Sequence, residues 1–265
     1  MLGTGLEGIP RRLWLDAKAA SHRLLMLDYD GTLAPFRIDR HEALPLPGTV
    51  ERLDAIAARG ATRVVVVSGR PIAELDPLLG PLEATLIGEH GWEEREPGGE
   101  ILQEPLPEIA RVALDRAAEA ASACDWQDRL ERKRSSLVLH TRGLAPEEAS
   151  RIESECERLW WFVEAAGLQR RSVDGGVELR VCGRDKGTAV RHLIASSPLR
   201  PFPVYLGDDD TDEDAFGAVQ PDGYGIRVGP ASYPSRAVGR LTSWEAVPEF
   251  LDKWSLVVER MSDWR

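Results

Sequence analysis

The sequence predicts an α/β protein whose core is a doubly wound, mostly parallel, Rossmann-like sheet with an inserted α+β cap domain. Short continuous runs of Val, Ile and Leu, typical of strands buried on both faces, alternate along the chain with amphipathic helical stretches. This alternation stops near residue 104, where a helix–strand–strand pattern occurs twice, and it resumes near residue 183. We therefore expect residues 1–104 and 183–265 to form the core domain and residues 105–182 to form the cap.

The core elements follow from apolar periodicity and from the glycines and prolines that separate them. Before the cap we expect a strand over 23–30, a helix over 48–59, a strand over 61–67, a short helix over 71–80 and a strand over 84–91. After the cap we expect a helix over 186–197, a strand over 203–210, a helix over 211–220, a strand over 223–229 and a terminal helix over 244–261.

The cap pattern predicts two helices that alternate with two pairs of strands. The expected elements are a helix over 107–123, two strands within 127–142, a helix over 146–166 and two strands within 168–181. Trp160 and Trp161 lie between Leu159 and Phe162, and this apolar run predicts that both tryptophans are buried on the second cap helix.

Composition narrows the class of partner. The 265 residues are 43% hydrophobic and 29% charged, which is typical of a globular protein with a sizeable core. A net charge of -11 argues against nucleic acid as a partner. There is no apolar run long enough to cross a membrane, and the N-terminal stretch is charged where a signal peptide is apolar, so we expect a cytoplasmic protein with no membrane partner. The three cysteines are far apart in the sequence and are expected to be reduced thiols.

The expected core strands end in sequences rich in acidic, hydroxyl and glycine residues. These are Asp28-Tyr29-Asp30-Gly31, Ser68-Gly69-Arg70, Gly88-Glu89-His90-Gly91 and Gly207-Asp208-Asp209-Asp210. Ligands of open α/β sheets bind beyond the carboxyl ends of the strands. Lys186, at the start of the helix that follows the cap, adds a cation. We therefore expect one polar site at this edge of the sheet.

Phosphoryl transfer through an aspartyl phosphate needs this set of residue types. Asp28 can attack phosphorus, provided that a divalent metal and a cation such as Lys186 neutralise the meeting anions. Asp28 and Asp208 offer the oxygen ligands that Mg²⁺ prefers. Asp30 is placed to protonate the leaving oxygen and then to activate water. By itself, however, an Asp-x-Asp-Gly sequence is also ordinary turn chemistry.

Four ordered motifs, DYDGTL, VVSGR, RDKG and GDDDTDEDAF, resemble those of the haloacid dehalogenase superfamily of phosphotransferases. A finer resemblance, to trehalose-6-phosphate phosphatases, lies in LDYDGTLAPF, GEHG, ERK followed by LVLHTR, VELR and GDDDTDEDAF, and it extends over the cap. The resemblance implies a Mg²⁺-dependent hydrolase of trehalose 6-phosphate, with a functional link to trehalose-phosphate synthase.

The resemblance also implies roles for individual residues. Asp28 corresponds to the nucleophile, Asp30 to the general acid and base, and Lys186 to a catalytic cation. The implied phosphate-binding residues are Ser68, Gly69 and Lys186. The implied Mg²⁺ ligands are Asp28, Asp30 through its main-chain carbonyl, Asp208 and, in support, Asp212. The implied substrate contacts are Arg70 and His90 in the core and Glu131, Lys133, Arg142 and Glu178 in the cap.

Other interpretations stay open at the level of sequence. Acidic residues in the first turn are also typical of a helix N-terminus, which is an alternative for Asp209, Asp210, Glu213 and Asp214. The ERKR run at 131–134 is also typical of a solvated surface. A related sugar phosphatase acting on sucrose phosphate or mannosyl phosphoglycerate is a second functional hypothesis. A catalytically silent sugar-phosphate sensor is a third, although the predicted proton shuttle at Asp30 argues against it.

Overall fold

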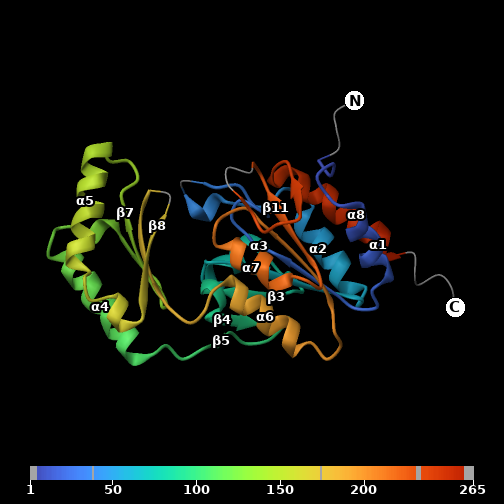
Figure 1. Ribbon diagram of the computed structural model, residues 1–265, viewed down its shortest axis with the longest axis horizontal. Coiled ribbons are helices and arrows are strands. Elements are labelled where there is room, and N and C mark those ends of the chain that lie inside the picture. The colour runs from blue at the N-terminus through green and yellow to red at the C-terminus, as the bar shows by residue number, and fades with distance from the viewer. Residues whose placement is uncertain (1–4, 38, 174, 231–233, 260–265) are drawn as a thin grey trace. The chain divides into compact units, whose positions relative to one another are not determined.

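The computed structural model describes residues 5–37, 39–173, 175–230 and 234–259 (Figure 1). Within these residues the chain divides into two compact units, with boundaries between Gln103 and Glu104 and between Arg184 and Asp185. The unit built from both ends of the chain is called the core unit below, and the inserted unit is called the cap unit.

The core unit contains one eight-stranded sheet. Its strands are β1 (Arg23–Leu27), β2 (Thr62–Val67), β3 (Thr85–Gly88), β4 (Glu93–Arg95), β5 (Leu102–Gln103), β10 (Phe202–Gly207), β11 (Tyr224–Val228) and β12 (Gly239–Leu241). Their order is β12-β11-β10-β1-β2-β3-β4-β5. All pairs from β12 to β3 are parallel, whereas β4 and β5 are antiparallel additions at one edge.

Helices cover both faces of this sheet, as the continuous apolar strands predict. The core helices are α1 (Arg11–Ala19), α2 (Thr49–Ala58), α3 (Ile72–Leu79), α6 (Lys186–Ser196), α7 (Asp212–Val219) and α8 (Val247–Glu259). Alternate residues of β1 enter different apolar clusters: Leu25 packs in the cluster of α1, α2, α3 and α8, while Met26 packs in the cluster of α6 and α7. This arrangement confirms the predicted doubly wound α/β fold.

The cap unit is a four-stranded antiparallel sheet with two helices. Its elements are α4 (Glu108–Ser122), β6 (Leu130–Arg132), β7 (Ser136–His140), α5 (Pro146–Leu159), β8 (Leu168–Val173) and β9 (Gly176–Val181), with strand order β6-β7-β9-β8. The side chains of Leu137, Leu139 and Leu179 are fully buried on one face. Both helices pack against that face (Figure 1), which leaves the alternate, polar positions on the other face.

The structure departs from the sequence prediction at the second cap helix. The predicted helix over 146–166 ends at Leu159 and is followed by a single 3₁₀ turn, Glu164–Ala166. Trp160 is buried and its indole N–H donates to the carbonyl of Ala117 (3.0 Å). Trp161 is 74% exposed, so the prediction that it is buried was wrong. Because the helix ends at Leu159, the helical periodicity no longer determines on which side the Trp161 side chain lies.

Four further elements, α1, β4, β5 and β12, were not predicted, and the three strands among them are only two or three residues long. The predicted terminal helix begins later than expected, because residues 244–246 form a 3₁₀ turn ahead of α8. Its last two predicted residues, 260 and 261, lie outside the described residues.

Candidate active site

The carboxyl ends of β1, β2 and β10 bring the predicted core residues together. Leu27, the last residue of β1, pairs with Leu206 of β10 on one side and with Val66 of β2 on the other. The next residue, Asp28, therefore lies between the segments that contain Ser68 and Asp208. Its backbone N–H donates to the carbonyl of Leu206 (2.9 Å), which fixes the start of the loop.

Lys186 joins two buried carboxylates. Its Nζ lies 2.8 Å from Oδ1 of Asp28 and 2.8 Å from Oδ1 of Asp212, and all three side chains are at most 5% exposed. Lys186 is the first residue of α6, and Asp185 caps that helix by accepting from the N–H of Thr188 (2.6 Å). Burial alone would lower the pKa of Lys186, but the charges of Asp212 and Asp28 outweigh it and raise that pKa well above its ordinary value.

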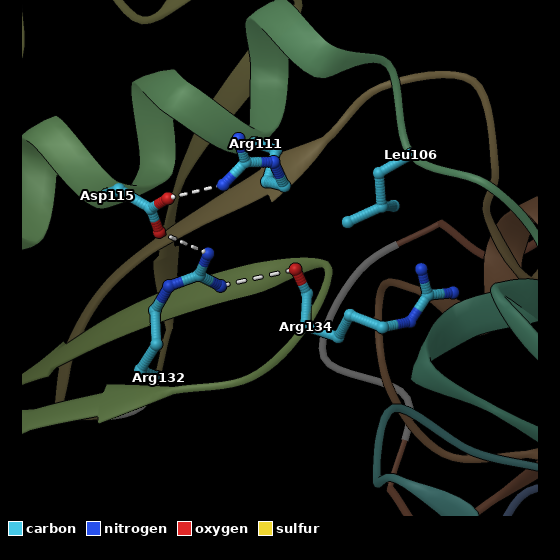
Figure 2. A pocket seen from close by; sticks show the side chains of 5 residues that line it. All are labelled: Leu106, Arg111, Asp115, Arg132 and Arg134. Atoms are coloured by element: carbon cyan, nitrogen blue, oxygen red, sulfur yellow. Dashed lines mark hydrogen bonds and ion pairs between the residues drawn. The ribbon is translucent and has the colours of Figure 1, made fainter.

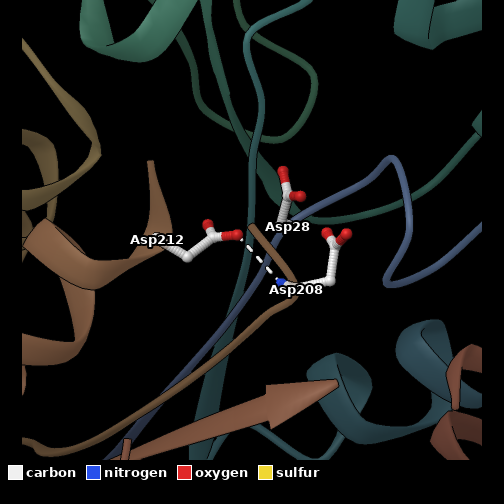
Figure 3. Close-up of side chains that lie close together, drawn as sticks. All are labelled: Asp28, Asp208 and Asp212. Carbon is white, nitrogen blue, oxygen red and sulfur yellow. Dashed lines mark hydrogen bonds between the residues drawn. The ribbon is translucent and has the colours of Figure 1, made fainter. Parts of the chain in front are cut away.

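Asp28, Asp208 and Asp212 form an acidic cluster that is suited to a divalent cation (Figure 3). One oxygen from each carboxylate lies within 4.8 Å of the others. Burial raises the pKa of Asp28 well above 3.8, and Lys186 only partly opposes this. Burial and the neighbouring charges of Asp212 and Asp209 raise the pKa of Asp208 to about 8. Carboxylates with such raised pKa values are destabilised as anions, and a hard cation would relieve the repulsion.

Asp212 differs from the other two because its oxygens already accept four hydrogen bonds. Lys186 Nζ (2.8 Å) and the hydroxyl of Tyr205 (2.7 Å) donate to Oδ1, while the backbone N–H groups of Asp208 (2.9 Å) and Asp209 (3.1 Å) donate to Oδ2. This geometry fits a residue that orients Lys186 and the Asp208 loop. Asp28 and Asp208 fit direct metal ligation better. The contribution of Tyr205 was not predicted, because a tyrosine within an apolar strand looks like a core residue.

Gly31 allows the loop after β1 to approach Asp208. Its φ is +78°, a left-handed conformation that favours glycine. A Cβ at this position would lie 2.2 Å from Oδ2 of Asp208. The hydroxyl of Thr32 donates to Oδ1 of the same carboxylate at 3.5 Å. Gly31 is therefore required for two reasons, namely its left-handed backbone conformation and its close approach to the loop that contains Asp208.

Asp30 is held by Arg70 in a two-pronged ion pair. Nε and Nη2 of Arg70 donate to the two carboxylate oxygens at 2.7 and 2.5 Å, and Nη1 donates to the carbonyl of Arg40 (2.7 Å). The Arg70 side chain is 5% exposed and its guanidinium lies 5.3 Å from the ring centre of Tyr29. Arg70 was predicted as a substrate contact, and the structure places it first as the partner of the predicted proton shuttle.

Ser68, Gly69 and His90 form a close-packed corner beside these residues. The Ser68 hydroxyl accepts from the backbone N–H of Arg70 (3.1 Å), and the backbone N–H of His90 donates to the carbonyl of Ser68 (2.9 Å). A Cβ on Gly69 would lie 2.5 Å from Nε2 of His90, so the imidazole packs directly on the glycine. His90 is buried and has a φ of +58°.

The predicted cap residues lie on the polar face of the cap sheet or beside it. Glu131 lies between Lys133 and His140, with Nζ of Lys133 3.4 Å from one of its oxygens and Nε2 of His140 2.9 Å from the other. Glu178 of β9 pairs with Arg180 at 2.7 Å. His140 and Arg180 were missed as neighbours of the predicted residues. Their spacing is a usable signal, because each lies an even number of residues from another polar residue on its strand.

Arg142 lies in the loop after β7. Its backbone N–H donates to the carbonyl of Gly175 (3.1 Å) in the turn between β8 and β9.

The ERKR run is divided between the two faces of the cap sheet. A pocket of about 310 Å³ near α4 is lined by Leu106, Arg111, Asp115, Arg132 and Arg134 (Figure 2). Asp115 accepts from Arg111 (3.1 Å) and from Arg132 (2.9 Å), which ties α4 to β6. Arg132 therefore has a structural partner, whereas Glu131 and Lys133 belong to the polar face.

Comparison with known proteins identifies the family. Residues 26–243 match the family model described as trehalose-phosphatase. The chain belongs to the trehalose-phosphatase family. It is 30% identical to a probable trehalose-phosphate phosphatase of Sinorhizobium fredii, with 84% of each chain covered. It is 33% identical to a trehalose-phosphate phosphatase of Mycobacterium marinum, covering 84% of this chain and 58% of that protein.

The chain spans only a third of another relative, the bifunctional trehalose-6-phosphate synthase/phosphatase of Thermoproteus tenax, to which it is 33% identical over 91% of its own length. Among solved structures, the trehalose-6-phosphate phosphatase of Aspergillus fumigatus superimposes with a TM-score of 0.67 at 26% identity, covering 93% of this chain and 96% of that one. The C-terminal domain of the Candida albicans trehalose-6-phosphate phosphatase shares the fold, with a TM-score of 0.77 at 23% identity. The match covers 97% of this chain and 100% of that one. No helix in the described part of the chain is both long and apolar enough to span a bilayer.

Proposed function

We propose that the protein hydrolyses trehalose 6-phosphate to trehalose and phosphate through an aspartyl phosphate on Asp28. The observation that carries this proposal is the buried contact between Lys186 and Asp28 (2.8 Å) beside Asp208. Family membership supports the substrate, and the strand-end geometry supports the reaction. A cytoplasmic location and a functional link to a synthase are part of the same proposal, the latter suggested by the bifunctional relative.

In the proposed mechanism, Asp28 attacks phosphorus and the bond to the sugar oxygen breaks. Lys186 stays protonated, since its pKa is raised, and its charge offsets that of the incoming phosphate. Asp30 donates a proton to the leaving oxygen and then removes one from the water that cleaves the aspartyl phosphate. Arg70 orients Asp30 for both transfers through its two hydrogen bonds. Ser68, Gly69 and Lys186 would bind the phosphate oxygens.

Mg²⁺ fits the donor set of the acidic cluster. Asp28 and Asp208 would hold the ion with their side chains, and Asp30 would contribute its main-chain carbonyl. Asp212 would support the site by accepting from the backbone N–H of Asp208, which orients the Asp208 loop. When bound, the cation supplies charge neutralisation for the phosphate and the attacking carboxylate.

Substrate recognition is assigned to both units. Arg70 and His90 in the core unit, and Glu131, Lys133, Arg142 and Glu178 in the cap unit, would contact the sugar. The polar face of the cap sheet supports this assignment, because its carboxylates and cations can accept from and donate to hydroxyls.

A panel of sugar phosphates, assayed for phosphate release with and without Mg²⁺, tests the proposal. Trehalose 6-phosphate should be the preferred substrate, and preference for sucrose phosphate or mannosyl phosphoglycerate would favour the generic sugar phosphatase. Asp28→Asn should abolish turnover with the fold intact. Asp30→Asn should impair trehalose 6-phosphate far more than p-nitrophenyl phosphate, whose leaving group needs no proton. Binding without any turnover would instead favour the silent sensor.

A further inference from the structure

The cap sheet repeats one arrangement of charged residues on two strands. β6 and β9 each pair antiparallel with β7, so they run in the same direction on either side of it. Glu131 of β6 and Glu178 of β9 both lie opposite Val138 of β7. The two glutamates are therefore in the same register and on the same face, roughly 10 Å apart, which is two strand spacings.

A cation follows each glutamate two residues later. The backbone N–H of Lys133 donates to the carbonyl of Ser136 (2.9 Å), which continues the β6 ladder, and Arg180 pairs with the same Ser136 from the other side. Each cation contacts its own glutamate, at 3.4 Å for Lys133 and 2.7 Å for Arg180. Arg180 thus occupies on β9 the position that Lys133 occupies on β6.

Arg180 also carries a buried donor without an acceptor. The Arg180 side chain is 6% exposed, Nη2 donates to Glu178, and for Nε the described residues provide no hydrogen-bond partner. A buried N–H left in this state is unfavourable, and a ligand oxygen that reaches it recovers the lost hydrogen bond. Nε and Nη2 lie along one edge of the planar guanidinium, so such an oxygen would lie beside the Glu178 carboxylate.

We propose that Arg180 is a further sugar-binding residue, which donates Nε–H to a hydroxyl of the substrate and holds Glu178 to accept from a neighbouring hydroxyl. This proposal rests on the proposed function, in that it assigns the second charged pair of the polar face to the same sugar-phosphate substrate. The donor and acceptor lie side by side, which matches the adjacent hydroxyls of a pyranose ring, since each hydroxyl can donate and accept.

The test compares Arg180→Met, Arg180→Lys, Glu178→Gln and the Glu178→Gln/Arg180→Met double variant. Arg170→Met is the matched control, because Arg170 lies on the neighbouring strand β8 but pairs with the exposed Glu157 of α5. For each variant, kcat and KM are measured with the sugar phosphate that the wild type prefers and with p-nitrophenyl phosphate, and thermal unfolding is recorded.

Arg180→Met should lower kcat/KM for the sugar phosphate about 10- to 100-fold, the effect of one or two lost charge-assisted hydrogen bonds, with a much smaller effect on p-nitrophenyl phosphate. Arg180→Lys should fall between Arg180→Met and wild type, because it keeps a charge for Glu178 but not the Nε donor. The double variant should lose less than the product of the single losses, since both residues act as one unit. The Arg170→Met control should match wild type.

An equal loss on both substrates, or a loss on the sugar phosphate no larger than that of Arg170→Met, would overturn the role of Arg180. Failure of the proposed function is a separate result, because it appears as a wild type that does not prefer trehalose 6-phosphate. The Arg180 comparison is then made on the preferred sugar phosphate, or on its binding affinity where there is no turnover, and it still decides the assignment.

Discussion

Replacing Gly31 by alanine should damage the active site through a single methyl group. The added Cβ would lie 2.2 Å from Oδ2 of Asp208, whereas a carbon–oxygen contact needs roughly 3.3 Å. The Asp208 carboxylate must therefore move by about 1 Å, and a displacement of that size at reacting groups costs on the order of 100-fold in rate.

The backbone cost of this substitution can be separated from its effect on Asp208. Gly31 has a φ of +78°, and a non-glycine residue there is destabilised by roughly 1–2 kcal/mol. Gly60, exposed at the end of α2, has a φ of +72° and no atom within 4 Å of an added Cβ. Gly60→Ala therefore has the same backbone cost but displaces nothing.

The assay measures kcat/KM for p-nitrophenyl phosphate, the Mg²⁺ concentration for half-maximal activity, and the free energy of unfolding. Both variants should lose about 1–2 kcal/mol of stability, whereas only Gly31→Ala should lose about 100-fold in kcat/KM and need more Mg²⁺. If Gly31→Ala remained within twofold of Gly60→Ala in activity, the close approach of Gly31 to Asp208 would not control the activity.

Three further outcomes follow from the burial of ionisable side chains. The folded-state pKa of Asp208 is raised from 3.8 to about 8, so the metal-free protein should lose stability as the pH rises from about 4 to 8. Mg²⁺ should therefore raise the melting temperature more at pH 8 than at pH 5. Equal increases at the two pH values would contradict the metal site. Asp212→Asn should cost at least about 2 kcal/mol in unfolding free energy and most activity, because its amide would leave buried donors without an acceptor, whereas the exposed Asp210→Asn should do neither. Burial raises the pKa of Cys156 to about 12, so iodoacetamide at pH 8 should modify the exposed Cys182 and spare Cys156 until the protein is denatured, as mass spectrometry would show.

The positions of the core site residues were predictable because of one topological rule. Parallel strands gather their carboxyl ends at one edge, so Asp28, Ser68 and Asp208 could be placed near each other without knowing any loop conformation. Which side chains pair with one another was not predictable. Arg70 is 40 residues from Asp30 in sequence, and the pairing depends on the path of the loop after β2. Likewise, Tyr205 looks apolar in its strand, and only the structure shows its hydroxyl on Asp212.

Some of the missed elements did carry a signal. In α1, Leu13, Trp14 and Ala17 are buried at helical spacing, so the N-terminal stretch carries the apolar periodicity of an amphipathic helix. The exposure of Trp161 had no such signal. No glycine or proline lies between Leu159 and Gly167 to stop the helix, and an apolar run without a break predicts burial for every aromatic residue in it.

The proposed sugar contacts of Glu178 and Arg180 depend on the register between β7 and β9, which the polar–apolar alternation of one strand does not specify. A slip of one residue between β7 and β9 would turn Glu178 and Arg180 toward the helices and bring leucine to the polar face. Gly176, at the start of β9, opposes this slip, because a Cβ there would lie 2.4 Å from the carbonyl oxygen of Leu139, so only glycine permits the observed approach. The proposed sugar contacts of the VELR motif therefore require the register that the preceding Gly176 favours. Replacing Gly176 should alter substrate preference, although glycine has no side chain that could bind a hydroxyl.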